Sequence, residues 1–182
     1  KTRKHMKKLI LAMIVALMAT GSAYAQLVKR YNTTTLSRAE DLMNEGKLDE
    51  SLILFEEELK EHPKNPYAHF LMTTIYMEMG RYDEAMPAID KALKYMPKRH
   101  KEMRGIAHAL KATIHETFQE WEEAVEQLTL CLSVLPKDEA SYQDRAVAHN
   151  QRAKLYYKLG KNELAEQDIQ KSSEFNSLAT SK

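Results

Sequence analysis

Three histidines recur along this chain and are the side chains most able to do chemistry. His69, His108 and His149 are 39 and 41 residues apart, and His115 follows His108 two helical turns later. Such a series is typical of a metal site or a pH sensor. However, equivalent positions in neighbouring helix layers lie about 10 Å apart, too far to share one metal ion. We therefore predict semi-buried rings that pack beside helices, with no metal and no cofactor.

The other reactive residue types do not form a catalytic pattern. Carboxylates cluster at 56–58 and 120–123, but within helical runs, where they indicate solvated faces. The sequence contains no G-x-S-x-G, no Gly-rich phosphate loop, no H-E-x-x-H and no C-x-x-C. Cys131 is the single cysteine, and we expect it to be a small buried apolar residue. The sequence thus predicts a protein that is not an enzyme and has no catalytic residues.

The elements that position these side chains are pairs of helices. Between Pro66 and Pro97, two runs of helical periodicity flank Gly80, and proline closes the unit. The same arrangement of two helical runs around a turn residue occurs three more times, with glycine or glutamine at the turn: Gly46, Gln119 and Gly160. Small residues follow these turns at Ser51, Ala85, Ala124 and Ala165, where they allow two helices to pack closely.

These four units resemble the tetratricopeptide repeat, a helix-turn-helix unit of about 34 residues. The resemblance implies an all-α fold, a right-handed solenoid of four antiparallel helix pairs. The repeats are expected at about 32–65, 66–99, 105–138 and 146–176, within an array that covers 36–175. The extra residues before the third and fourth units predict first helices lengthened by one to two turns, with Asp138 capping a helix that starts at Glu139.

The front of the chain is typical of a secretory signal peptide. Met6 is the expected initiator, Lys7 and Lys8 precede an apolar run from Leu9 to Ala19, and residues 23–25 match an A-x-A cleavage site. The predicted segments are a signal peptide helix at 1–25, a flexible lead-in at 26–35 and a tail at 177–182. Cleavage near Ala25-Gln26 predicts a periplasmic or secreted protein with no mature membrane span.

Cleavage also changes the charge balance. The whole chain carries 27 basic and 26 acidic residues, but residues 1–25 contain five basic and no acidic ones. The mature chain would therefore have a formal charge of −4, from 22 basic and 26 acidic residues. This argues against non-specific binding of nucleic acid, which depends on clustered positive charge.

In tetratricopeptide proteins the first helices line a concave groove that holds peptides. The resemblance places the following residues in that groove: Tyr67, Phe70, Thr74, Met77, Ile106, Thr113, Asn150, Gln151, Lys154 and Tyr157. The family's clamp for a C-terminal carboxylate needs Lys and Asn where this chain has Leu36, Glu40 and Leu71, so that ligand is not expected. The Met-rich first half suits adaptable hydrophobic recognition. A second interpretation is that Phe70 and Leu71 only pack between repeats.

The expected function is a non-catalytic scaffold, exported to the bacterial periplasm or cell exterior, that binds a partner protein or peptide in this groove. One alternative is the N-terminal repeat region of a longer exported protein whose catalytic or anchoring domain lies beyond Lys182. Another is a structural homo-oligomer that closes through the last helix pair. We expect Leu155, Leu159, Leu164 and Ile169 to be partly uncovered there.

Overall fold

The computed structural model describes residues 29–180, and within that range the chain is helical with no strand. The helices are α3 (Thr34–Asn44), α4 (Leu48–Glu61), α5 (Pro66–Met79), α6 (Tyr82–Tyr95), α7 (Lys101–Thr117), α8 (Trp121–Val134), α9 (Tyr142–Lys158) and α10 (Asn162–Thr180), with a 3₁₀ turn η1 (Glu139–Ser141) before α9. The predicted all-α fold of helix pairs is confirmed for this range. The signal peptide expected at 1–25 lies outside the described residues.

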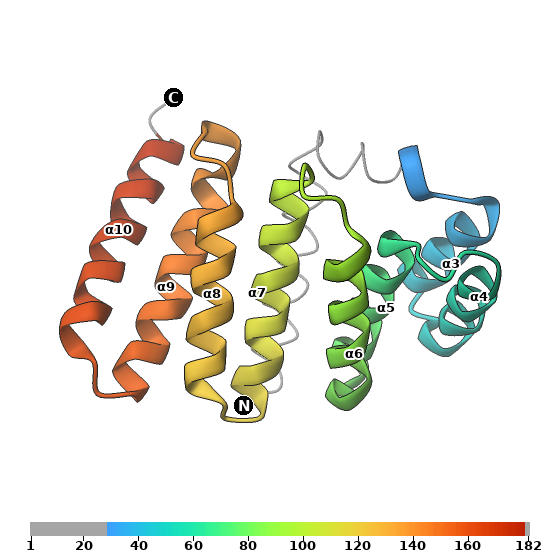
Figure 1. Ribbon diagram of the computed structural model, residues 1–182, viewed down its shortest axis with the longest axis horizontal. Helices are drawn as coiled ribbons and strands as arrows, with labels where there is room; N and C mark the ends of the chain where they lie inside the picture. Colours follow the sequence, from blue (N-terminus) through green and yellow to red (C-terminus); the bar gives the residue numbers. More distant parts are fainter. Residues whose placement is uncertain (1–28, 181–182) are drawn as a thin grey trace. The chain divides into compact units, whose positions relative to one another are not determined.

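The chain divides into two compact units, one ending at Pro97 and one beginning at Lys98. In unit 1, α3 packs on α4 and α5 on α6; in unit 2, α7 packs on α8 and α9 on α10. Each pair is antiparallel and side by side (Figure 1). Within each unit the second helix of one pair also contacts the first helix of the next, α4 with α5 and α8 with α9. Each unit is thus a stack of two helix pairs.

Turns between paired helices use the left-handed backbone conformation. Gly80 has φ of 78°, and its N–H donates to the carbonyls of Met77 and Tyr76 at the end of α5. Gln119 occupies the equivalent turn between α7 and α8 with φ of 63°, and it is the one non-glycine residue with positive φ among residues 29–180. A side chain in this conformation is strained, because Cβ approaches the backbone carbonyl.

Small residues let the paired helices approach. In the first pair, the buried Ser51 hydroxyl donates to the carbonyl of Ala39 across the pair at 2.7 Å. In the last pair, Ser172 donates to Ala146 at 2.8 Å in the same manner. At Gly105 on α7, an added Cβ would lie 2.5 Å from Leu135 Cδ2, so this approach requires glycine. Close packing of this kind holds the two helices of a pair against each other.

The first helices of unit 2 are longer than α5, by slightly less than the one to two turns predicted. Helices α7 and α9 each have 17 residues, whereas α5 has 14. Asp138 caps η1 by accepting the N–H of Ser141 at 3.2 Å. Both helices therefore begin before the repeat boundaries expected at 105 and 146.

The ends of the array differ from the sequence prediction. The segment expected to be a flexible lead-in is held in place from Tyr31 onward, because Asn65 Nδ2 donates to the Tyr31 carbonyl and Thr33 Oγ1 donates to Glu58 Oε2 at 2.6 Å. Thr33 is also the N-cap of α3, so that helix starts inside the predicted lead-in. At the other end, α10 continues through most of the predicted tail, as far as Thr180.

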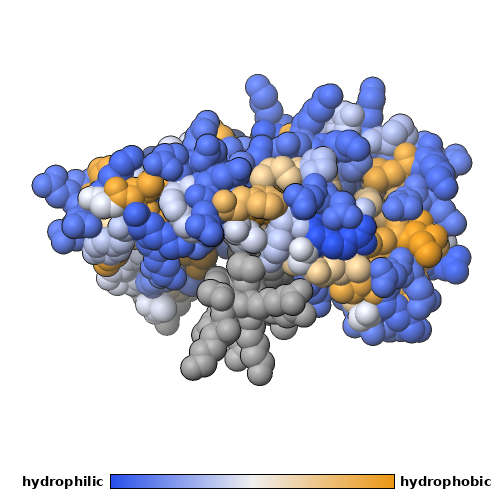
Figure 2. Space-filling model, turned by 90° about the horizontal axis from the view of Figure 1, so that it is seen from below, coloured by the Kyte–Doolittle hydropathy of each residue, from blue (hydrophilic) through white to orange (hydrophobic). Residues whose placement is uncertain are grey.

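Exposed apolar side chains are scattered on the surface. Figure 2 shows one face of the molecule, where hydrophobic residues form separate patches among hydrophilic ones. In the last pair, Leu164 and Ile169 are 42% and 45% exposed, as expected. Leu155 was also expected to be uncovered, but it is fully buried. No helix of residues 29–180 has the length and apolar character needed to cross a membrane.

Candidate functional site

The four predicted groove residues of unit 1 lie on α5 and are buried. Asn65 starts this helix by accepting the N–H groups of Tyr67 and Ala68, and Pro66 occupies its first turn. Apolar residues then occur on all sides of the helix, which is typical of a helix that is covered all round. Tyr67, Phe70, Thr74 and Met77 are each at most 3% exposed. In this structure they contribute packing, and the expected open groove is not present at these four positions.

In unit 2 the structure brings two of the predicted residues into contact. Gln151 on α9 donates from Nε2 to Thr113 Oγ1 on α7 at 3.2 Å, across 38 residues of sequence. The Thr113 hydroxyl in turn donates to the Ala109 carbonyl at 3.1 Å. Both side chains are half-buried, and Lys154 is exposed one turn further along α9. Ile106, also predicted for this surface, is only 8% exposed.

One helical turn further, the same two helices are joined by a charged contact. Lys158 Nζ lies 3.2 Å from Glu116 Oε1 and 3.9 Å from the centroid of the Trp121 ring. The Lys158 and Glu116 side chains are 42% and 34% exposed, so this ion pair contributes little to stability. We call the surface formed by Thr113, Glu116, Gln151, Lys154 and Lys158 the α7–α9 surface.

Asn150 and Tyr157 do not belong to the α7–α9 surface. Each residue of an α-helix turns the side chain by about 100°, so Tyr157 lies about 120° around α9 from Gln151. Asn150 instead borders a shallow depression with Ile169 and Ser172 of α10. Tyr157 is 46% exposed. The place of these two residues in the groove of Gln151 stays a prediction.

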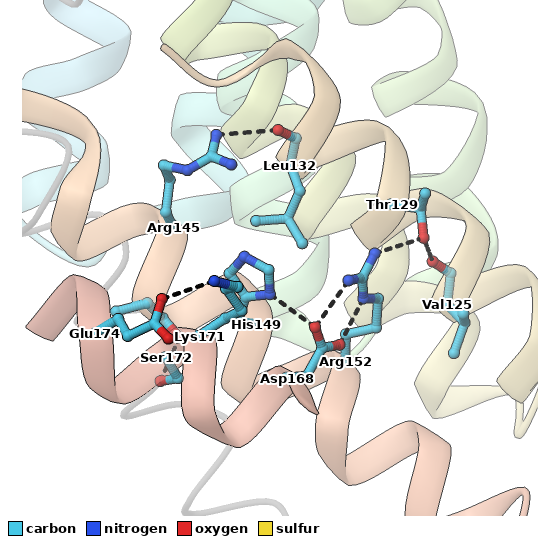
Figure 3. Close-up of polar contacts among 11 residues, drawn as sticks. Val125, Thr129, Leu132, Arg145, His149, Arg152, Asp168, Lys171, Ser172 and Glu174 are labelled. Atoms are coloured by element: carbon cyan, nitrogen blue, oxygen red, sulfur yellow. Dashed lines mark hydrogen bonds and ion pairs between the residues drawn. The ribbon is translucent and has the colours of Figure 1, made fainter. Parts of the chain in front are cut away.

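A buried polar cluster joins α8, α9 and α10 (Figure 3). Asp168 on α10 accepts from Arg152 Nε and Nη2 at 2.7 and 2.8 Å. Its Oδ1 also lies 2.8 Å from His149 Nδ1. Arg152 donates further to Thr129 Oγ1 on α8 at 2.9 Å. Burial alone would raise the pKa of Asp168, but the hydrogen bonds from Arg152 and His149 outweigh burial and hold this pKa below its usual value.

The paired His149 and Asp168 have no nucleophile beside them among the hydrogen bonds of residues 29–180. The Phe175 ring stacks on His149 with centroids 5.8 Å apart. The Ser172 hydroxyl donates its hydrogen bond to the Ala146 carbonyl. Burial raises the pKa of Cys131 to about 12, so its thiol stays protonated and unreactive at neutral pH. The cluster links α8, α9 and α10 through polar contacts. Sequence patterns did not predict it, because Arg152 and Asp168 are 16 residues apart on different helices.

The other two histidines of the series also pair locally. His69 Nε2 lies 3.0 Å from the Pro63 carbonyl, and His108 Nδ1 lies 3.0 Å from Gln127 Oε1 on α8. Burial is the main cause that lowers the pKa of both rings. No group of three or more His, Cys, Asp or Glu side chains within residues 29–180 could hold a metal ion. The three rings are at most 9% exposed and pack beside their helix pairs.

Comparison with known proteins agrees with the repeated helix pairs. Two family models, both described as Tetratricopeptide repeat, match residues 42–114 and 146–177, which together exceed half of the chain. No curated protein matches the chain.

The fold is also similar to that of solved structures named MamA. "MamA RS-1 ArsTM double mutant" has a TM-score of 0.69 at 14% identity, over 97% of this chain and 98% of that one. "MamA 41-end from Desulfovibrio magneticus RS-1" has a TM-score of 0.65 at 14% identity, over 94% and 95%. "MamA AMB-1 P212121" has a TM-score of 0.65 at 17% identity, over 92% and 93%. At these identities the likeness extends to the fold alone.

Proposed function

Because the chain belongs to the tetratricopeptide-repeat family, we propose that it is a non-catalytic scaffold that holds a partner protein on the first helices of its repeats. The observation that carries this proposal is the contact between Thr113 and Gln151, which joins α7 and α9 into one accessible polar surface. The partner would lie across the α7–α9 surface as an extended or helical peptide. In the described part of unit 1, the predicted groove residues of α5 are buried.

The chemistry of the α7–α9 surface fits a peptide with polar side chains. Gln151 and Thr113 offer an amide and a hydroxyl, which can both donate and accept hydrogen bonds. Lys154 is an exposed cation near them, while Glu116 already faces Lys158. Val147 is 38% exposed one turn before Gln151 and supplies an apolar contact. A surface of this mixed kind suits recognition by hydrogen bonds with a small apolar anchor.

Export is the second element of the proposal. The basic residues Lys7 and Lys8, the apolar run after them and the A-x-A site at 23–25 support secretion to the periplasm or beyond. Mass spectrometry of the protein from cells would test this. A mature chain that starts at Gln26 and is recovered from the periplasm or medium is expected. A cytoplasmic chain with residues 7–25 intact would contradict export.

Site-specific photo-crosslinking in the producing cells tests the partner site. A photoreactive amino acid at Lys154 is expected to give a discrete adduct with a protein partner, because this exposed position borders the Thr113–Gln151 contact. The matched control places the same amino acid at Glu166, an exposed position on α10. Adducts of equal yield at both positions, or at neither, would contradict a partner site on the α7–α9 surface.

Self-association through α10 is a second candidate, favoured by its exposed apolar side chains. Leu164, Ile169 and Leu178 are 42%, 45% and 51% exposed on this last helix. A homo-oligomer that buries them would be broken by Ile169→Glu. Light scattering after size-exclusion chromatography tests this, and a wild-type monomer at high concentration would rule out closure through α10.

A further inference from the structure

The side-chain amide of Gln151 has an orientation that is fixed from the neighbouring helix. Thr113 on α7 has one hydroxyl proton, and it donates this proton to the Ala109 carbonyl at 3.1 Å. Toward α9, the Thr113 oxygen can therefore only accept a hydrogen bond. Gln151 meets this requirement by turning its nitrogen to α7, with Nε2 3.2 Å from Thr113 Oγ1. An amide turned the other way would place two acceptor oxygens against each other.

This contact leaves a defined pair of polar groups on Gln151. A primary amide has one acceptor oxygen and two N–H donors, and Thr113 takes one of the donors. Within residues 29–180 the Gln151 side chain makes no other hydrogen bond, so Oε1 and the second N–H remain for a ligand. Because this side chain is half-buried and already held in place, it loses less freedom when a ligand binds.

One acceptor beside one donor matches the main chain of an extended peptide. Each residue of such a peptide offers an N–H and a C=O group, whereas those inside a helix are already bonded to each other. Main-chain hydrogen bonds also supply much of the affinity when extended peptides are recognised. Lys154, exposed nearly one turn later on α9, can donate to a further carbonyl. The donors and acceptors of this surface therefore favour an extended segment.

The apolar side chains around Gln151 do not suit a helical ligand. A helix that lies in a groove is held by apolar anchors at i, i+3 or i+4 and i+7. Here Val147 is 38% exposed one turn before Gln151, but Ile106 and Ala109 on α7 are only 8% and 7% exposed. Val147 can contact one apolar side chain of an extended segment, which is less than the apolar stripe of a helix requires.

We propose that Gln151 binds the main chain of an extended segment of the partner protein, and that Thr113 positions the amide for this contact. The inference rests on the proposed function and deepens it, because it selects an extended partner segment over a helical one. Gln151 Oε1 accepts a backbone N–H of the segment, and the remaining N–H of Gln151 donates to a backbone carbonyl. Val147 contacts an apolar side chain beside that peptide group, where proline is excluded because it has no N–H.

A phage-displayed library of random dodecamers supplies the probes. The library is first depleted on the double variant Val147→Glu/Lys154→Glu, which removes peptides that bind elsewhere, and is then selected on the full wild-type chain. Labelled synthetic peptides are titrated by fluorescence anisotropy. We expect peptides that bind the wild type at least tenfold more tightly than the double variant. If no such peptide is found, the proposed function fails and the inference fails with it.

Backbone N-methylation of a selected peptide removes one N–H at a time. At one position we expect the methyl group to raise the Kd for the wild type about tenfold. In Gln151→Leu, which keeps a similar volume without polar atoms, the same methyl group should raise the Kd less than about twofold. Equal losses in both proteins at every position would overturn the inference alone, and the proposed function would stand.

Two substitutions at Thr113 separate positioning from packing. Thr113→Val keeps the shape of the side chain but removes its oxygen, so the Kd of a selected peptide should rise about three- to tenfold. Thr113→Ser keeps the oxygen and loses a methyl group, so its Kd should stay within about twofold of the wild type. Packing alone predicts the reverse order, and that order would overturn the positioning role of Thr113. Circular dichroism checks the fold of each variant.

Discussion

His149 Nδ1 and Asp168 Oδ1 lie 2.8 Å apart and join α9 to α10 within the last helix pair. Position 149 is one of three equivalent histidines, and position 168 lies 19 residues later on the partner helix. His108 and Gln127 have the same separation and the same contact, at 3.0 Å between α7 and α8. In both pairs of unit 2, therefore, the first helix is tied to the second by a histidine and a polar residue at a fixed interval.

Replacement of Asp168 by asparagine should destabilise unit 2. The variant keeps the shape of the side chain but removes the charge that faces the partly buried Arg152. Removal of one partner of a buried ion pair leaves the other uncompensated, so we expect a loss of about 3 kcal/mol in the free energy of unfolding. The measurement is urea unfolding followed by the fluorescence of Trp121, the single tryptophan, which lies in α8 of unit 2. Glu166→Gln, at an exposed position of the same helix, is the control and should have little effect.

Replacement of Gln119 by glycine should stabilise unit 2. Gln119 has φ of 63°, a conformation that glycine adopts without the Cβ clash. The greater freedom of glycine in the unfolded chain offsets part of the gain, so we expect about 0.5 to 1 kcal/mol. Gly160→Ala is the converse control at φ of 70°, where no neighbouring atom lies within 4 Å of the added Cβ. Its expected loss of about 1 kcal/mol comes from the backbone alone, and a stable Gly160→Ala variant would contradict this account.

His108 should make unit 2 less stable in acid. Its folded-state pKa is lowered, mainly by burial, from the ordinary value of 6.5. The unfolded state then binds the proton more readily, so the stability that neutral His108 provides is present above pH 6.5 and is lost as the pH falls below it. His108→Gln removes this contribution. The measurement is the free energy of unfolding, followed by Trp121 fluorescence, at pH values between 7.5 and 5. As the pH falls over this range, the free energy of unfolding of the variant should fall less, or rise more, than that of the wild type. Identical pH profiles would contradict the prediction.

Asp144 should act in the opposite direction. Burial, followed by repulsion from Glu102, raises its pKa from 3.8 to about 6. The folded state then holds the proton more tightly than the unfolded state, so this contribution favours folding at low pH and is lost as the pH rises through 6. At pH 7.5 we expect Asp144→Asn to stabilise unit 2 by about 1 to 2 kcal/mol, since the group is only partly shielded from water. The gain should disappear at pH 4, and a pH-independent gain would point to packing instead.

Much of this fold could be predicted from the sequence because the determinants are local. Gly80 marks a turn that needs positive φ, and prolines such as Pro63 follow the helix ends. Small residues such as Ser51 occur where two helices must touch, and periodic apolar residues define which faces are buried. These signals act over a few residues, so the helix pairs and the lengthened α7 and α9 follow from spacing alone.

The sites could be predicted only in part. Thr113 and Gln151 were assigned correctly to neighbouring first helices, and the structure shows their contact. Asn150 was grouped with them, and it borders a depression with Ile169 and Ser172 of α10. Phe70 was expected at an open surface, yet α5 is apolar all round and is buried.

The sequence by itself determined the repeated helix pairs, their turns and the absence of a known catalytic motif, because each depends on residues close together in the chain. Only the tertiary structure decided which polar groups meet. Arg152 contacts both Asp168 and Thr129, and Arg145 donates to the carbonyls of Leu132 and Leu135 at the end of α8. Such contacts depend on helix rotation and on the approach of α7 to α8 at Gly105, which packing fixes and residue spacing does not encode.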